Sequence, residues 1–147
     1  MAPIAASIEI ARRTDDVFAY LDDLARHGEW QEQLISAQKL GDAPTQVGTK
    51  STETRRMGKR EQTTTYAVTE HDPPRVFGFH GIDGPLRAVG KVTVEPLAGG
   101  SSSRVSLVLD FEGHGLGKLL VSLARSQSRK QVPKDQQRLK ERLESAA

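Results

Sequence analysis

Hydrophobic residues between about positions 116 and 143 recur at helical spacing, at roughly 100° per residue. One side of this predicted helix carries four leucines followed by two glutamines: Leu116, Leu119, Leu120, Leu123, Gln127 and Gln131. Amides where a packed core would need carbon indicate a helix that borders a space as well as a core. Pro133 predicts a kink or break near 129–132, because Val132, Leu139 and Leu143 lie rotated by roughly 150° from the leucines.

Most of the preceding chain alternates apolar and polar positions and is divided by turn signals such as Asp72-Pro73-Pro74 and Gly99-Gly100-Ser101. This pattern predicts an antiparallel meander. Strands are expected at 6–12, 35–41, 49–56, 61–71, 75–81, 86–96 and 103–112. The fold class is therefore α+β, with a long terminal helix across the open face of a seven-stranded sheet.

Two short helical segments are expected after the first strand. Thr14 is the expected N-cap of the first, with Asp15 and Asp16 in its first turn. Gly28 is expected to end this region, and a second short turn is expected at 29–31.

The 147 residues fit a single domain with a core of its own. The absence of cysteine excludes disulfides, thiolate metal sites and cysteine nucleophiles. The N-terminal residues do not resemble a signal peptide, and no stretch approaches the roughly 18 apolar residues of a membrane span. We expect a soluble, cytoplasmic protein.

Positive charge is concentrated at the C-terminal end. Residues 116–147 contain eight Lys or Arg and three Asp or Glu, although the net charge of the whole chain is only +2. The simplest interpretation is the solvated back of an amphipathic helix; the alternative is transient contact with an anionic membrane surface. Aromatic residues for base stacking are missing from this segment, so nucleic acid is not an expected partner.

Several stretches resemble the START-like (SRPBCC) superfamily of polyketide cyclase/dehydrase and lipid transport proteins. The resemblance covers nearly the whole chain and includes the opening helix at 14–23, Glu29-Trp30, Val47-Gly48-Thr49, Val68-Thr69-Glu70 with Pro73-Pro74-Arg75, 116–120 and 132–140. It implies a helix-grip fold, in which a curved sheet wraps a long helix and leaves a cavity for a hydrophobic or amphipathic small molecule. It does not imply one activity, because similar members include carriers and aromatase/cyclases.

The third strand leaves an alternative open. If Ser51, Glu53, Arg55 and Met57 face inward, a carboxylate and a guanidinium enter the cavity. If Thr52 and Thr54 face inward instead, this strand contributes no charge to the interior, which suits simple binding. We favour solvated Glu53 and Arg55, since charged residues are seldom fully buried.

The candidate ligand-binding residues are mostly apolar or aromatic. They are Trp30, Met57, Tyr66, Phe77, Phe79, Leu107, Leu109, Phe111, Leu120, Leu123 and Gln127. The four histidines show no ligand spacing typical of a metal helix, and the glycines at 113, 115 and 117 do not match a phosphate loop. We expect no metal and no cofactor.

Two functions follow as hypotheses. The first is binding or transport of a hydrophobic small molecule, lipid or polyketide-like, by a monomer or homodimer. The alternative is a cyclase/aromatase/dehydrase-type enzyme, whose first catalytic candidates are Glu53, Arg55, Tyr66 and His80.

Overall fold

The computed structural model describes residues 3–145, apart from the side chain of Met57. Strands dominate the described chain, and the helical segments lie near its two ends apart from one short turn between β6 and β7. In order, the elements are β1 (Ile4–Ile10), α1 (Thr14–Asp22), η1 (Leu24–Glu29), β2 (Leu34–Leu40), β3 (Lys50–Met57), β4 (Arg60–Asp72), β5 (Val76–Gly81), β6 (Leu86–Leu97), η2 (Ala98–Gly100), β7 (Ser102–Gly113), η3 (Gly115–Leu120) and α2 (Val121–Ser145), where η marks a 3₁₀ helix.

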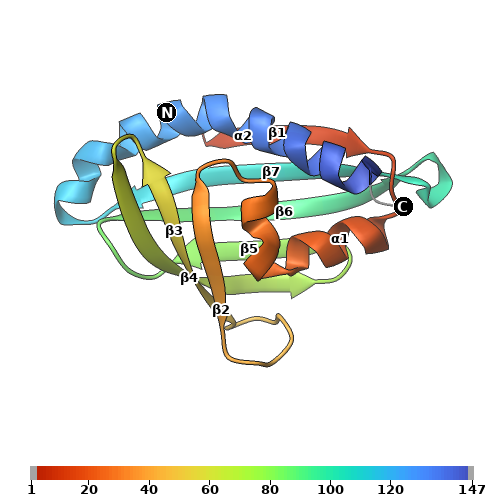
Figure 1. The fold of residues 1–147 in the computed structure, drawn as a ribbon, viewed down its shortest axis with the longest axis horizontal. Helices are drawn as coiled ribbons and strands as arrows, with labels where there is room; N and C mark the ends of the chain where they lie inside the picture. The colour runs from red at the N-terminus through yellow and green to blue at the C-terminus, as the bar shows by residue number, and fades with distance from the viewer. Residues whose placement is uncertain (1–2, 146–147) are drawn as a thin grey trace.

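The strands form one antiparallel sheet in the order β1-β7-β6-β5-β4-β3-β2. β2 to β7 are sequential neighbours, and β1 pairs with β7 at the far edge. Figure 1 shows α2 passing along one side of the sheet, while β2 to β4 run steeply across the long strands β6 and β7. The predicted α+β class and seven-stranded antiparallel sheet are confirmed.

The main core lies where α1 and the C-terminal half of α2 meet the sheet. Val17 and Phe18 of α1, Val94 and Val105 of the sheet, and Leu139 of α2 are all buried in it. The expected Thr14 N-cap is wrong: Arg13 precedes the helix as its cap residue, with no side-chain capping bond. The second helical segment is η1, which ends at Glu29, rather than a turn at 29–31.

The terminal helix differs from the sequence prediction in three ways. Residues 115–120 form the 3₁₀ helix η3, and α2 then runs through Pro133 without the expected break. The predicted leucine face is also wrong, because the buried positions of α2 are instead Ala124, Val132, Asp135, Gln136, Leu139 and Leu143. A 3₁₀ helix has 3.0 residues per turn, so a count of 100° per residue cannot be carried through it.

The second half of α2 is fastened to the edge strand β1. Gln136 Nε2 donates to the carbonyl of Ala6 at 3.1 Å, and Lys140 Nζ donates to the carbonyl of Glu9 at 3.0 Å. The backbone amide of Ala11 also donates to Glu144 at 2.9 Å. These bonds and the buried Leu139 hold this half of the helix against the sheet.

Candidate functional site

A cavity of about 240 Å³ lies between the inner face of the sheet, η1 and α2. A single water needs roughly 10–15 Å³, so this is a void of molecular size rather than a packing defect. Its walls include Trp30 after η1, residues of β3 to β7, and Ala124, Gln127 and Ser128 of α2. Small side chains at Ala124 and Ser128 leave the sheet side of this helix unfilled.

Aromatic and aliphatic side chains form much of the wall. Alternation along the strands turns Phe77 and Phe79 of β5, and Leu107 and Leu109 of β7, toward the same space. The rings of Phe77 and Phe79 lie 6.4 Å apart, and Tyr66 meets Phe79 edge-on at 6.0 Å. Phe111 also lines the cavity. This surface suits an apolar or aromatic molecule.

A charged pair on β3 also faces the cavity. Arg55 Nε donates to Glu53 Oε1 at 3.0 Å, and the guanidinium of Arg55 also donates to Gln31. The Glu53 side chain is only 10% exposed and that of Arg55 34%. The open question of strand parity is therefore answered, and the favoured solvated placement is wrong. Thr52 and Thr54 instead pair with threonines of β4.

Asp135 brings a second carboxyl group to the same wall from α2. Its Oδ1 accepts from Gln131 Nε2 at 2.9 Å and from the amide of Glu32 at 3.2 Å. Burial raises the pKa of Asp135, although these two hydrogen bonds and the charge of Arg55 oppose that shift. The cavity wall therefore has an apolar part and a polar part, and the polar part contains acidic and basic side chains, Glu53, Asp135 and Arg55.

Three further polar groups of the cavity wall are affected by burial. Burial, followed by the nearby charge of Glu53, raises the pKa of Tyr66, so its hydroxyl stays neutral at physiological pH. Burial lowers the pKa of His27, whose Nε2 lies 2.7 Å from the carbonyl oxygen of Leu21. Within the described residues, Trp30 Nε1 is buried without a hydrogen-bond partner.

Not every candidate residue lines the cavity. His80 lies on the outer face of β5, where Nε2 is 2.8 Å from Glu112 Oε1, because it alternates with Phe79 along the strand. Leu120 and Leu123 are 41% and 55% exposed and are absent from the cavity wall. The side chain of Met57 lies outside the described residues. The other candidates, including Gln127, do line the cavity.

Sequence reasoning missed several polar wall residues. Gln31, Gln33 and Gln136 carry no motif, and only the fold brings them to the cavity. Asp135 offered a usable signal, since it follows Gln127 and Gln131 at successive intervals of four on the helix. Extending the glutamine series by one turn would have included it.

Two negative findings apply to the described part of the chain. No group of three or more His, Asp or Glu side chains there is arranged to hold a metal ion. None of the helices of residues 3–145 is long and apolar enough to cross a membrane.

Several solved structures are similar to this chain over nearly its whole length. A protein of Thermus thermophilus has 19% identity, with a TM-score of 0.79 over 96% of both chains. A START superfamily protein of Mycobacterium smegmatis has 14% identity and a TM-score of 0.77 over 98% of both. The Zhui aromatase/cyclase of a Streptomyces species has 14% identity and a TM-score of 0.74, over 96% of this chain and 90% of that one.

At these identities the solved structures establish a shared helix-grip fold alone. No match was found among curated protein sequences. The family model described as "Polyketide cyclase / dehydrase and lipid transport" matches residues 1–144. The chain therefore belongs to the polyketide cyclase/dehydrase and lipid transport family.

Proposed function

We propose that this protein binds a hydrophobic or amphipathic small molecule in the cavity between the sheet and α2. The observation that carries the proposal is the void of about 240 Å³ whose wall joins three phenylalanines to the Glu53–Arg55 pair. Ligand sites are typically concave and largely apolar, with a few converging polar groups.

The wall also suggests the chemistry of the ligand. Its apolar body lies against Phe77, Phe79 and Phe111, while an oxygen function accepts a hydrogen bond from Arg55 or from the neutral hydroxyl of Tyr66. A carbonyl or hydroxyl group on an aromatic or short aliphatic body meets both requirements. The volume lies just below the roughly 300–1,000 Å³ of sites for drug-sized ligands, which favours a compact molecule.

A pair of serine variants tests binding. Ser128 lines the cavity, whereas Ser126 lies exposed on the same helix and does not. Ser128→Phe should fill the void and weaken binding of the dye anilinonaphthalene sulfonate at least about tenfold, since excluding apolar contact removes about 1.5 kcal/mol or more. Ser126→Phe should bind like the parent.

The fluorescence of Trp30 can report dye binding. Trp30 is the single tryptophan and lines the cavity, so its fluorescence should change when the dye enters. Equal binding by Ser128→Phe and Ser126→Phe would place the dye elsewhere and contradict the proposal. Urea unfolding of both variants checks that they fold.

A cyclase/dehydrase-type reaction is the second candidate function, and the Glu53–Arg55 pair in the cavity favours it. A carboxylate beside a guanidinium can move a proton while the cation polarises a carbonyl group. Incubation with a flexible polyketone mimic, followed by mass spectrometry, should show loss of water that Glu53→Gln abolishes. Binding of the mimic without such a change would favour the carrier.

A further inference from the structure

Four leucines at the start of the terminal helical region are exposed. Leu116 and Leu119 of η3 are 82% and 80% exposed, and Leu123 of α2 is 55% exposed. Leu120 between them is 41% exposed. We call these residues the leucine strip. Exposed apolar residues occur singly on most surfaces, but a contiguous group of large ones marks a contact site.

Local geometry holds the strip together and turns it outward. Side chains three apart in a 3₁₀ helix are eclipsed, so Leu116 and Leu119 lie side by side, and Leu123 follows one turn later. Gly117 takes the opposite side of η3, where a Cβ atom would overlap the carbonyl oxygen of Pro85. Pro85 belongs to the loop between β5 and β6. Because Gly117 packs directly on this loop, the leucines point away from it.

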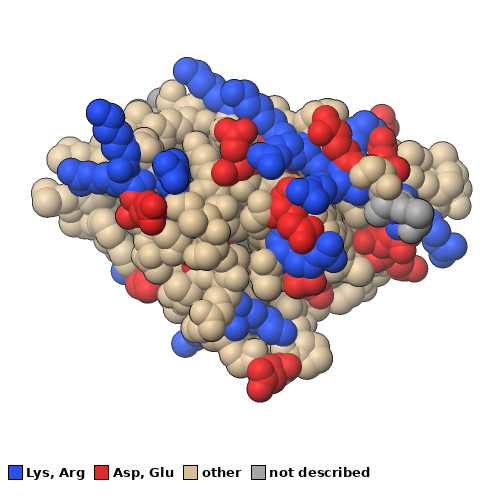
Figure 2. All heavy atoms as spheres, in the orientation of Figure 1, with Lys and Arg blue, Asp and Glu red and all other residues tan. Residues whose placement is uncertain are grey.

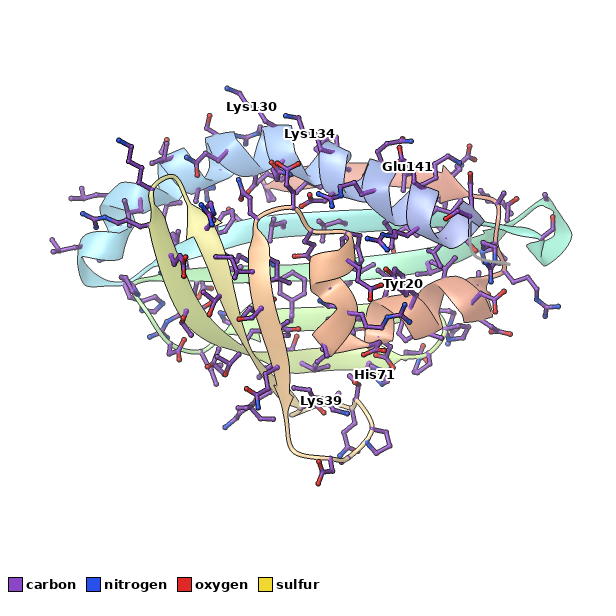
Figure 3. All side chains as sticks on the ribbon, viewed as in Figure 1. Tyr20, Lys39, His71, Lys130, Lys134 and Glu141 are labelled. Atoms are coloured by element: carbon purple, nitrogen blue, oxygen red, sulfur yellow. The ribbon has the colours of Figure 1, made fainter. Side chains whose placement is uncertain are left out.

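Positive charge is concentrated on the segment of chain that carries the strip. Residues 113–134 contain five Lys or Arg and no Asp or Glu. Arg125 is paired with Asp110 at 2.6 Å, while Lys118, Lys130 and Lys134 are exposed. Figure 3 shows Lys130 and Lys134 extending from α2 away from the sheet. In Figure 2, the left end of the molecule, where the light-blue segment before α2 lies in Figure 1, carries uncharged atoms with Lys and Arg beside them and a smaller group of Asp or Glu.

We propose that the leucine strip docks on the surface of an anionic lipid bilayer. Apolar side chains that enter the interface and cations that meet lipid phosphates are the two contributions by which peripheral segments bind membranes. A second copy of the chain is a poorer occupant, because pairing two strips would bring two sets of cations together. This proposal goes beyond ligand binding and does not require it.

The strip also adjoins the cavity. Ala124, which follows Leu123, lines the cavity, as does Leu86, which follows the Pro85 that η3 contacts. A bilayer that covers the strip therefore lies next to one end of the cavity. Docking here gives an apolar ligand a short path between hydrocarbon and protein.

Sedimentation with vesicles tests the docking. The protein should sediment with phosphatidylcholine vesicles that contain phosphatidylglycerol, less so as salt is added, and weakly with phosphatidylcholine alone. The double variant L116S/L119S should bind at least roughly tenfold more weakly, because two leucine side chains no longer enter the bilayer. The charge-reversal variant K118E/K130E should also lose binding, with less dependence on salt.

Val47→Ser is the matched control, since Val47 is 61% exposed in the loop between β2 and β3, far along the chain from the strip. It should bind vesicles like the parent. Absence of sedimentation with the anionic vesicles, or equal binding by L116S/L119S and the parent, would overturn the proposal. A dimer without vesicles that L116S/L119S dissociates would overturn it in favour of self-association. Dye binding by L116S/L119S reports separately on the ligand cavity.

Discussion

Glu53 and Arg55 are two residues apart on β3, so both side chains leave the same face of the strand. Taking a pair of charges out of water costs several kcal/mol per ion before their attraction compensates, so such pairs are weak evidence for stability. A strand of ordinary core residues would fill the same wall at less cost. Contact with a polar group of a ligand, as proposed above, would account for their position in the cavity.

Asp135 gives a prediction about pH at the scale of a single residue. Burial raises its pKa in the folded protein, so the folded state binds its proton more tightly than the unfolded state does. Stability from this group is present at low pH and is lost as pH rises from about 4 through the folded pKa. Asp135→Asn should therefore gain stability relative to the parent as pH increases to about 7.

Urea unfolding across that pH range measures the difference. The asparagine oxygen can still accept the bonds from Gln131 and from the amide of Glu32, so the geometry is kept. Asp42→Asn, in the exposed turn after β2, controls for the loss of one negative charge. A difference between Asp135→Asn and the parent that is the same at every pH would contradict the assignment.

At the scale of elements, η3 depends on the absence of a side chain at Gly117. The close approach of Pro85 to this position leaves no space for a methyl group, and the atoms that a Cβ would meet belong to backbone. Gly117→Ala should thus displace η3 from the β5–β6 loop and lower the free energy of unfolding by roughly 1–3 kcal/mol.

Gly28→Ala is the matched change, because a Cβ there would meet its nearest atom, the carbonyl oxygen of Leu34, at 3.4 Å. Its stability should stay within about 0.5 kcal/mol of the parent. Equal effects of the two alanines in thermal and urea unfolding would show that η3 is not held by this close approach.

The elements also show where sequence reasoning succeeds. The predicted strands agree with the structure to within about two residues, because alternation of apolar and polar residues is a local signal that the sheet preserves. The predicted helix face is wrong because it takes four leucines to be buried, whereas Leu139 and Leu143 fix the orientation of α2.

The cavity was predictable in part. Phe77, Phe79, Leu107 and Leu109 follow from strand alternation once the inner face is known. The sequence did not determine that Glu53 and Arg55 face the cavity. Strand register decides which face of β3 turns inward, and charged residues are usually exposed, which favoured the opposite orientation. Gln31 and Gln33 reach the wall through the path of the chain after η1, which carries no periodic signal.

At the scale of the whole molecule, the two halves of α2 are held differently. The second half is tied to β1 and buries Leu139, whereas the first half adjoins a cavity and the exposed η3. Amide hydrogens in 134–145 should therefore exchange more slowly than those in 116–126, which comprise most of η3 and the start of α2, since opening is easiest where few apolar contacts must break.

Hydrogen exchange with mass spectrometry measures this directly, and the dye should slow exchange in the first half more than in the second. The parent without dye is the reference for both halves. Uniform exchange along 116–145 would show that the cavity does not loosen the helix.

The bonds from Gln136 and Lys140 to the carbonyls of Ala6 and Glu9 also bear on association. A bare edge strand invites another chain to extend the sheet, and aggregates commonly grow in this way. Here the terminal helix occupies that position along β1. Unwanted sheet extension is therefore expected from the opposite border at β2, where Ile35 and Leu40 are 47% and 46% exposed.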